Sequence, residues 1–229
     1  MRANLSLNKS YDNVLIIVSH TDDETLGMGG VIAKHIKSGD NVSAISMTDG
    51  LSSRGEISQN EIQNRKNASA KASNILGFNW IKKGNFPDNQ MDSIALIDII
   101  KFIEKVKNQL LPTIIYTHSP ADLNVDHQLV SKAVLTAFRP QAEEFWKEIR
   151  LFEIPSATDY GHSSITNIFR PNLFINIEDT LEIKLKALKA YHSEMRSYPN
   201  SRSYRGVENL AEYRGNQVGL KYAESFEII

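Results

Sequence analysis

Short apolar runs alternate along the chain with longer segments whose apolar residues recur at helical spacing. The run at 14–18 is rich in β-branched residues, which is typical of a strand covered on both faces. Similar runs predict further strands at 41–47, 78–83, 113–117, 150–154 and 172–177. Helical spacing predicts helices at 25–38, 61–76, 94–110, 129–137 and 180–192. This alternation predicts an α/β fold in which helices cover both faces of a mainly parallel sheet.

The last part of the chain departs from this pattern. Residues 193–219 are rich in Ser, Arg, Tyr, Asn and Gly and have little apolar periodicity. A long, weakly patterned segment in a compact domain is usually functional or mobile. We therefore expect a single domain over residues 1–229 with an irregular C-terminal segment at about 193–229. This segment could form a lid or a homo-oligomer contact, and its Arg202 and Arg205 could bind a substrate phosphate or carboxylate or stay solvated.

Composition and charge exclude several classes of protein. The chain has 229 residues, 26 basic and 27 acidic side chains and a net charge of −1, and it carries no basic block of the kind that binds nucleic acid. Its first apolar run has five residues, too few for a signal peptide or a membrane span. It has no cysteine, so any metal must be held by nitrogen and oxygen. We expect a cytoplasmic protein.

Histidine and three acidic residues directly follow the first predicted strand. His20 and Asp23 lie three positions apart across a strand-to-helix turn, so both could reach one ion; alternatively, they only cap the helix and complement its dipole. Asp22 would point elsewhere, either as a general base for a water at the ion or as the N-cap. Glu24 could support the ligands or complement the helix dipole. Such junctions lie at the edge of a parallel sheet where ligands bind.

A second strand-to-helix junction about a hundred residues later has the same character. It follows the predicted strand at 113–117 and contains His118, Asp122, Asn124, Asp126 and His127. If the two strands are neighbours in one sheet, His20, Asp23 and His127 could converge. Two histidines and one carboxylate suit a catalytic zinc with an open position for water, and they also suit ferrous iron. We therefore predict one Zn²⁺ per chain, with Fe²⁺ as the alternative.

The other polar residues of the second junction have several possible roles. Asp126 could fix the tautomer of the adjacent His127. Asp122 and Asn124 flank the turn, and either could contact substrate hydroxyls, although Asp122 could instead only cap the turn. His118 could donate a proton or remain a solvated loop residue.

Two further candidates follow the second predicted strand. The loop that contains Asp49 and Arg54 opens on the same edge of the sheet, so both are predicted substrate contacts.

With both motifs in view, the chain resembles the LmbE-like, or PIG-L, family of zinc-dependent de-N-acetylases. The family's hallmark is His-Pro-Asp-Asp-Glu, and the matching residues here are His20-Thr21-Asp22-Asp23-Glu24. The resemblance implies a Rossmann-like three-layer fold, metal binding by His20, Asp23 and the downstream His127, and a general base at Asp22. It extends over most of the chain, including the closing residues 223–226.

Two positions depart from the family pattern. Thr21 replaces the usual proline, which loosens the turn and should leave the ligands in place. Many members have His-Pro-Asp-His at the second motif, where the first histidine helps to stabilise the oxyanion, but here the residue is Asn124. Losing one oxyanion donor costs about 2.7–4 kcal/mol. The Asn124 amide or His118 could take its place.

The resemblance implies a hydrolase that removes an acetyl or formyl group from the nitrogen of a small-molecule amino sugar or its conjugate. Three other readings stay open: a non-catalytic sugar or nucleotide binder, a ferrous oxygenase with two histidines and one carboxylate, and a purely structural metal site. The oxygenase fits less well, because such triads usually lie in all-β barrels.

Overall fold

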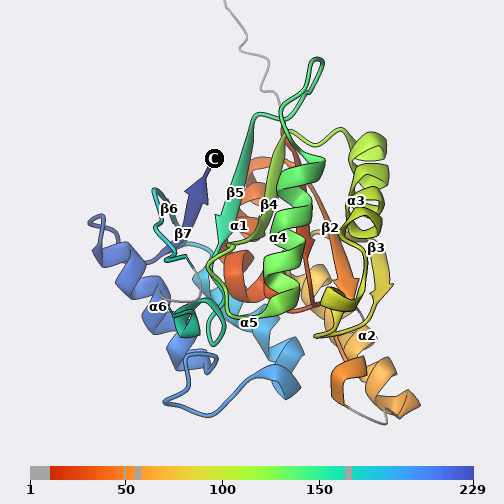
Figure 1. The fold of residues 1–229 in the computed structure, drawn as a ribbon. Helices are drawn as coiled ribbons and strands as arrows, with labels where there is room; N and C mark the ends of the chain where they lie inside the picture. Colours follow the sequence, from red (N-terminus) through yellow and green to blue (C-terminus); the bar gives the residue numbers. More distant parts are fainter. Residues whose placement is uncertain (1–10, 49, 55–57, 163–166) are drawn as a thin grey trace, which may run out of the picture.

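The computed structural model describes residues 11–48, 50–54, 58–162 and 167–229, which fold around one sheet (Figure 1). In the described residues the sheet has seven strands, in the order β3-β2-β1-β4-β5-β7-β6. Their bounds are β1 Asn13–Val18, β2 Asn41–Thr48, β3 Asn79–Phe86, β4 Ile114–His118, β5 Glu148–Phe152, β6 Leu173–Asn176 and β7 Ala223–Ile228. The predicted strands are therefore all present, and β7 is added to them.

The helices also follow the apolar spacing of the sequence. Their bounds are α1 Asp23–Ser38, α2 Gln59–Leu76, α3 Leu96–Leu110, α4 Val125–Ala137, α5 Leu181–Leu188 and α6 Tyr204–Asn216. Short 3₁₀ turns lie at η1 Ser52–Arg54, η2 Met91–Ser93, η3 Thr158–Tyr160 and η4 Lys189–Glu194. In the part of the chain that the structure describes, none of the helices is long and apolar enough to cross a membrane.

The strand order reverses between β1 and β4. From β1 the chain runs outward through β2 to β3, and it then returns to place β4 on the other side of β1. β1 pairs in parallel with β2 and with β4, and β4 pairs in parallel with β5. The two junctions that carry histidine and aspartate therefore follow neighbouring parallel strands. A reversal of this kind leaves a crevice at the carboxyl ends of the strands, where α/β proteins bind ligands.

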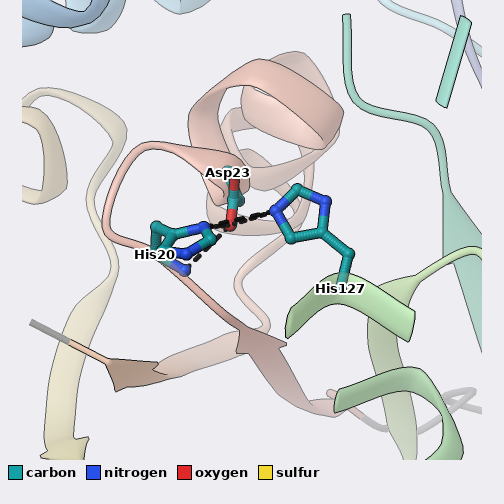
Figure 2. A group of neighbouring side chains, drawn as sticks. All are labelled: His20, Asp23 and His127. Carbon is teal, nitrogen blue, oxygen red and sulfur yellow. Dashed lines mark hydrogen bonds and ion pairs between the residues drawn. The ribbon is translucent and has the colours of Figure 1, made fainter. Parts of the chain in front are cut away.

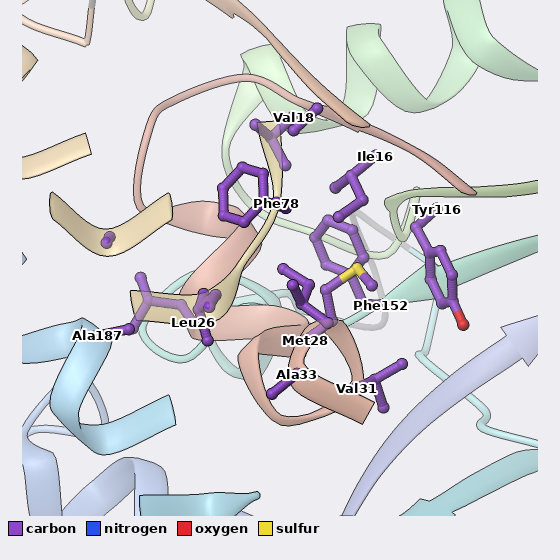
Figure 3. Packing of buried hydrophobic residues seen from close by; sticks show 14 of the residues in the cluster. Ile16, Val18, Leu26, Met28, Val31, Ala33, Phe78, Tyr116, Phe152 and Ala187 are labelled. Atoms are coloured by element: carbon purple, nitrogen blue, oxygen red, sulfur yellow. The ribbon is translucent and has the colours of Figure 1, made fainter. Parts of the chain in front are cut away.

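Alternating side chains of β1 face two separate hydrophobic layers. Ile16 and Val18 pack in a cluster with α1, α2 and α5, which Figure 3 shows in part. Leu15 and Ile17 pack in a second cluster with α3 and α4. Because successive side chains of a strand point to opposite faces, an all-apolar strand needs helices on both sides. The predicted three-layer α/β fold is thus confirmed.

Helix α1 lies close to β5 and to the segment after β6 because glycine occupies two contact positions. A Cβ atom at Gly27 would lie 2.5 Å from Phe152 Cδ2, and one at Gly30 would lie 2.8 Å from Ile177 Cγ2. These glycines lie within the helix, not in the turn before it. They allow the close approach of the helix to these neighbours.

Helix α1 is also kinked at Met28, and a buried ion pair satisfies the backbone groups freed there. The Glu224 carboxylate accepts the backbone N–H groups of residues 30–31 at 3.0 and 2.7 Å. Lys184 Nζ donates to the Leu26 carbonyl at 2.8 Å and to Glu224 at 2.6 Å. Buried charges need such partners, and here they fix the first turns of α1.

The expectation of an irregular segment at 193–229 is wrong. It contains α6 and then β7, which pairs antiparallel with β5 and β6. Ser203 caps α6 by accepting the Gly206 N–H at 2.9 Å. The helix buries only Val207, Ala211 and Gly215, one narrow stripe four residues apart. Because its other positions are mostly polar, the apolar spacing is too sparse to be recognised in the sequence alone.

Candidate metal centre

Three predicted ligands meet at the point where the strand order reverses. His20 lies in the turn after β1, Asp23 begins α1, and His127 lies in the first turn of α4; their side chains point toward one another in Figure 2. His20 Nδ1 lies 3.2 Å from Asp23 Oδ2 and 3.2 Å from His127 Nε2. His127 Nε2 lies 3.4 Å from Asp23 Oδ2. The predicted convergence of these three residues is confirmed.

The spacing of these three atoms fits a small divalent ion. Zinc bonds to histidine nitrogen and carboxylate oxygen are about 2.0–2.2 Å long, so tetrahedral ligand atoms lie about 3.3–3.5 Å apart. The observed separations of 3.2–3.4 Å agree with that geometry. All three side chains are buried, so the structure brings together charged and polar groups that a metal would satisfy. Two imidazoles and one carboxylate also suit ferrous iron.

Two carboxylates orient the His20 ring. Its Nε2 lies 3.0 Å from Asp88 Oδ1 and 3.3 Å from Asp126 Oδ2. Asp126 is itself held by the backbone N–H groups of Asn89 and Met91, at 2.7 and 3.2 Å. With the Nε2 hydrogen directed to carboxylates, Nδ1 is left as the lone-pair donor that faces the other two ligands. Burial opposes a charged ring, but the surrounding aspartates raise the pKa of His20 well above its usual value.

A single carboxylate orients the His127 ring. Asp122 Oδ2 lies 3.0 Å from His127 Nδ1 and also accepts the Thr158 hydroxyl at 2.8 Å. This leaves Nε2 to face the other ligands. Burial lowers the pKa of His127, but Asp23 and Asp122 outweigh it and raise that pKa to about 9. In the metal-free protein a proton therefore competes with the ion for this ligand.

The roles predicted for Asp122 and Asp126 are rearranged in the structure. The Asp126 carboxylate faces the ring of His20 and not the ring of His127, because the side chains of adjacent helix residues point in different directions. The partner of His127 is Asp122. Asp122 is fully buried and does not line the cavity at the site, so its place does not favour a contact with substrate hydroxyls.

Asp22 occupies the N-cap position of α1 but makes no side-chain capping bond. Its carboxylate instead lies between two guanidinium groups. Arg65 Nη2 donates to Oδ1 at 3.0 Å, and Arg202 Nη1 lies 3.5 Å from Oδ2. Burial raises the pKa of Asp22, although Arg65 opposes this. The Asp22 carboxylate therefore faces the cavity, where it pairs with arginine, and does not cap the backbone N–H groups of α1.

A polar cavity of about 120 Å³ opens beside the three predicted ligands. It is lined by His20, Asp22, Gly50, Ser53, Arg65, Asp88, Asn89, Asn124, His127, Glu194 and Arg202. A larger cavity of about 430 Å³ lies between the C-terminal ends of α3 and α4 and the loop at 139–146. None of the predicted site residues that the structure describes lines that larger cavity, so it is separate from this site.

Glu24 points away from the cavity and supports the first turn of α1. Its Oε1 accepts the hydroxyls of Thr25 at 2.7 Å and Tyr191 at 3.0 Å. Burial raises the pKa of Glu24 to about 7, and the nearby Asp22 adds to this effect. The residue thus ties the helix start to η4 in the C-terminal third of the chain.

His118 is the last residue of β4 and is fully buried. Its Nε2 accepts the Ser19 N–H at 2.9 Å, and its ring stacks on His127 with centroids 3.9 Å apart. Burial, together with His127, holds the pKa of His118 well below its usual value. It does not line the cavity, so its place does not favour the predicted role as a proton donor.

Asn124 caps helix α4 and also lines the cavity. Its Oδ1 accepts the N–H groups of Asp126 and His127 at 2.9 and 3.3 Å. Its amide nitrogen donates one hydrogen to Asn89 Oδ1 at 3.0 Å, which leaves the second amide hydrogen for a ligand.

Sequence reasoning did not single out Arg65, Asp88 and Glu194, which line the cavity. Asp88 follows β3 at the same sheet edge as the two junctions, and that position is a signal that could have identified it. Arg65 lies in a strongly polar part of α2, so its burial could not be recognised locally. The predicted substrate contacts Asp49 and the Arg54 side chain lie outside the residues that the structure describes.

Fold and site together define an α/β protein with a buried metal-binding group of two histidines and one aspartate at the switch point of its sheet. A family model described as PIG-L, GlcNAc-PI de-N-acetylase, matches residues 15–138, more than half of the chain. The protein belongs to the PIG-L family.

Individual relatives extend the comparison over the whole chain. Diacetylchitobiose deacetylase of Thermococcus kodakarensis is 26% identical over 246 residues, covering 100% of this chain and 88% of the relative. The structure of N,N'-diacetylchitobiose deacetylase from Pyrococcus horikoshii with its inhibitor MPG has a TM-score of 0.77 and 22% identity, covering 96% of this chain and 85% of that one. GalB, a 4-carboxy-2-hydroxymuconate hydratase from Pseudomonas putida, has a TM-score of 0.74 and 19% identity, covering 95% and 96%. These structures share the fold.

Proposed function

We propose that the protein is a metal-dependent hydrolase that removes an acetyl or formyl group from the nitrogen of an amino sugar or its conjugate. The observation that carries this proposal is the position of Asp22, which lines the same cavity as His20 and His127 and makes no capping bond. Family membership and the deacetylase relative support it. Zn²⁺ is the proposed ion, with Fe²⁺ as the alternative.

His20, Asp23 and His127 would hold the ion. When bound, the ion would polarise the acyl carbonyl and lower the pKa of a water from about 15.7 to near 7. Asp22 takes a proton from the attacking water on a carboxylate oxygen as the water oxygen bonds to the acyl carbon. It then gives that proton to the amine nitrogen as the C–N bond breaks, so that the products are a carboxylic acid and a free amine. The raised pKa of Asp22 suits a group that must briefly hold a proton.

The remaining residues of the cavity would bind and orient the substrate. Arg65 and Asp88 offer a donor and an acceptor of the kind that sugar hydroxyls need. The second amide hydrogen of Asn124 is the proposed donor to the oxyanion. Asp49 and Arg54 remain predicted substrate contacts from the sequence.

The first test is metal content by mass spectrometry, combined with release of acetate or formate from N-acyl amino sugars. We expect about one zinc or iron per chain, lost in His127→Ala and kept in Asp22→Asn. His192→Ala is the matched control, because this exposed histidine does not line the cavity. Wild-type protein that holds metal but releases no acid would contradict the proposal. Substrate binding without turnover would favour the non-catalytic binder.

A second candidate reaction has one observation in its favour. The hydratase from Pseudomonas putida shares this fold, so the fold alone is compatible with addition of water to a carbon–carbon double bond. Its identity of 19% is lower than the 26% of the deacetylase relative. Turnover of an unsaturated carboxylic acid, with no turnover of N-acyl sugars, would support it.

A further inference from the structure

Arg65 extends from α2 and contacts three residues: Thr21, Asp22 and Glu194. Its Nε donates to Thr21 Oγ1 at 3.0 Å, its Nη2 donates to Asp22 Oδ1 at 3.0 Å, and its Nη1 lies 2.8 Å from Glu194 Oε1. The residues involved are buried, and the Arg65 side chain is only 7% exposed. We call this set of four residues the arginine clamp.

The geometry of the guanidinium group makes these contacts interdependent. The group is planar, and its N–H directions are fixed relative to one another. When Thr21 accepts the Nε–H, the direction of Nη2 is set, and the ion pair between Nη1 and Glu194 keeps the guanidinium group in place. Thr21 and Glu194 therefore determine where Arg65 meets the Asp22 carboxylate.

Thr21 is the position at which this sequence departs from the His-Pro-Asp-Asp-Glu pattern. A proline side chain has no hydrogen-bond acceptor, whereas the threonine hydroxyl accepts the Arg65 Nε–H. Among the described residues, no other acceptor is recorded for that nitrogen. A buried N–H without an acceptor is unfavourable, so loss of the hydroxyl should make Arg65 move.

A cavity that Arg65 itself lines offers space for that movement. A second cavity of about 160 Å³ is lined by Thr21 and Arg65 together with Thr48, Leu51 and Ile62. Arg65 lines both this cavity and the one that holds Asp22, so the side chain separates the two. Without the Thr21 hydroxyl, we expect the guanidinium to rotate toward the second cavity, although Lys66 and Lys83 also line it, and to lose its present contact with Asp22.

We propose that Thr21 is a positioning residue whose hydroxyl holds Arg65 in the orientation that fixes the Asp22 carboxylate toward the substrate. The proposal rests on the proposed function, in which Asp22 is the general base. The proposal assigns a role to the threonine that replaces the usual proline. Its hydroxyl positions the neighbouring Asp22 through the side chain of Arg65, which belongs to α2.

Kinetics of Thr21→Val and Thr21→Ser on an N-acyl amino sugar test the proposal. Valine matches the shape of threonine but lacks the acceptor, so we expect kcat to fall about 5- to 20-fold, a fraction of the 10²–10⁴ that a positioned base contributes. KM should change less than about threefold, and metal content should be unchanged. Thr21→Ser keeps the hydroxyl and should stay within about threefold of wild type. Ile62→Val, which alters the second cavity without removing an acceptor, is the matched control.

Crystal structures of the same variants give a readout that is independent of turnover. In Thr21→Val the contact between Arg65 Nη2 and Asp22 Oδ1 should be broken, and in Thr21→Ser it should be kept. An unmoved Arg65 with kcat within twofold of wild type would overturn the proposal. Loss of metal in Thr21→Val, or failure of serine to restore kcat, would overturn it as well, since either would indicate a merely structural role. If wild-type protein releases no acid, the proposed function fails. The position of Arg65 in the crystal structures of the Thr21 variants then still tests whether the Thr21 hydroxyl holds Arg65 against Asp22.

Discussion

The two strand-to-helix junctions at the centre of the sheet use the same residue types differently. At the β1–α1 junction, Asp22 holds the N-cap position, makes no capping bond and faces the cavity. At the β4–α4 junction, Asn124 holds that position and accepts two backbone N–H groups. The nearby Asp122 is fully buried and holds His127. Thus the first junction supplies the proposed base, whereas the second supplies one ligand and its support.

The difference arises from what packs against each junction. Arg65 and Arg202 approach the first, so a carboxylate there is better paired with a guanidinium than with backbone N–H groups. At the second, Thr158 and His127 surround Asp122 and exclude it from the cavity. A junction motif therefore predicts where chemistry lies, and its neighbours decide which residue performs it.

The largest effect should come from Asp22→Asn, which removes the proposed base and keeps the shape of the side chain. We expect kcat to fall by about 10²–10⁴, with metal content equal to wild type. Acid release and metal content, measured on the same preparations, check this. Activity within tenfold of wild type would mean that the first junction does not supply the base.

Both junctions should make metal binding depend on pH. A ligand imidazole must be neutral to bind an ion, and the pKa of His127 is raised to about 9, while that of His20 is also raised. Below these raised pKa values protons compete with the ion, so affinity should rise with pH between 6 and 8, by up to about a hundredfold per unit if each ring releases one proton. Zinc competition titrations at pH 6, 7 and 8 measure this. An affinity that is constant over that range would contradict it.

Asp122→Asn and Asp126→Asn should weaken metal binding unequally. Asp122 is the carboxylate at His127 Nδ1, whereas the Nε2 of His20 has both Asp88 and Asp126. Loss of a carboxylate that orients a ligand typically costs about 10- to 100-fold in affinity. We expect that loss for Asp122→Asn and a smaller one for Asp126→Asn, from zinc titrations at one pH. The reverse order would contradict the assignment of partners.

A small effect on folding stability should come from Asn124→Ala, which tests the structural side of the second junction separately from the proposed oxyanion role. Loss of an N-cap side chain costs about 1 kcal/mol, or roughly 2–4 °C in Tm for a chain of this size. Thermal unfolding measures the loss, with Asn124→Asp as the control, since aspartate also caps helices. An unchanged Tm would show that the cap contributes no stability. A fall in kcat that corresponds to about 2.7–4 kcal/mol, with a stability loss of only about 1 kcal/mol, would support the proposed oxyanion role.

The sequence alone determined the elements and the place of the site. Apolar periodicity is a local property, so the strands through β6 and the helices through α5 could be predicted to within a few residues. Parallel strands expose their carboxyl ends on one edge, so His20, Asp23 and His127 could be expected to meet. The cytoplasmic location and self-association remain predictions of the sequence.

Only the tertiary structure decided which side chains are partners. Asp122 rather than Asp126 holds His127, and Arg65, although it lies in a polar helix, is buried against Asp22. Helix α6 likewise depends on packing, because its apolar stripe is too narrow to be recognised alone. Contacts between residues far apart in the chain leave no local pattern. Orientation, burial and charge pairing at this site are therefore properties of the assembled fold.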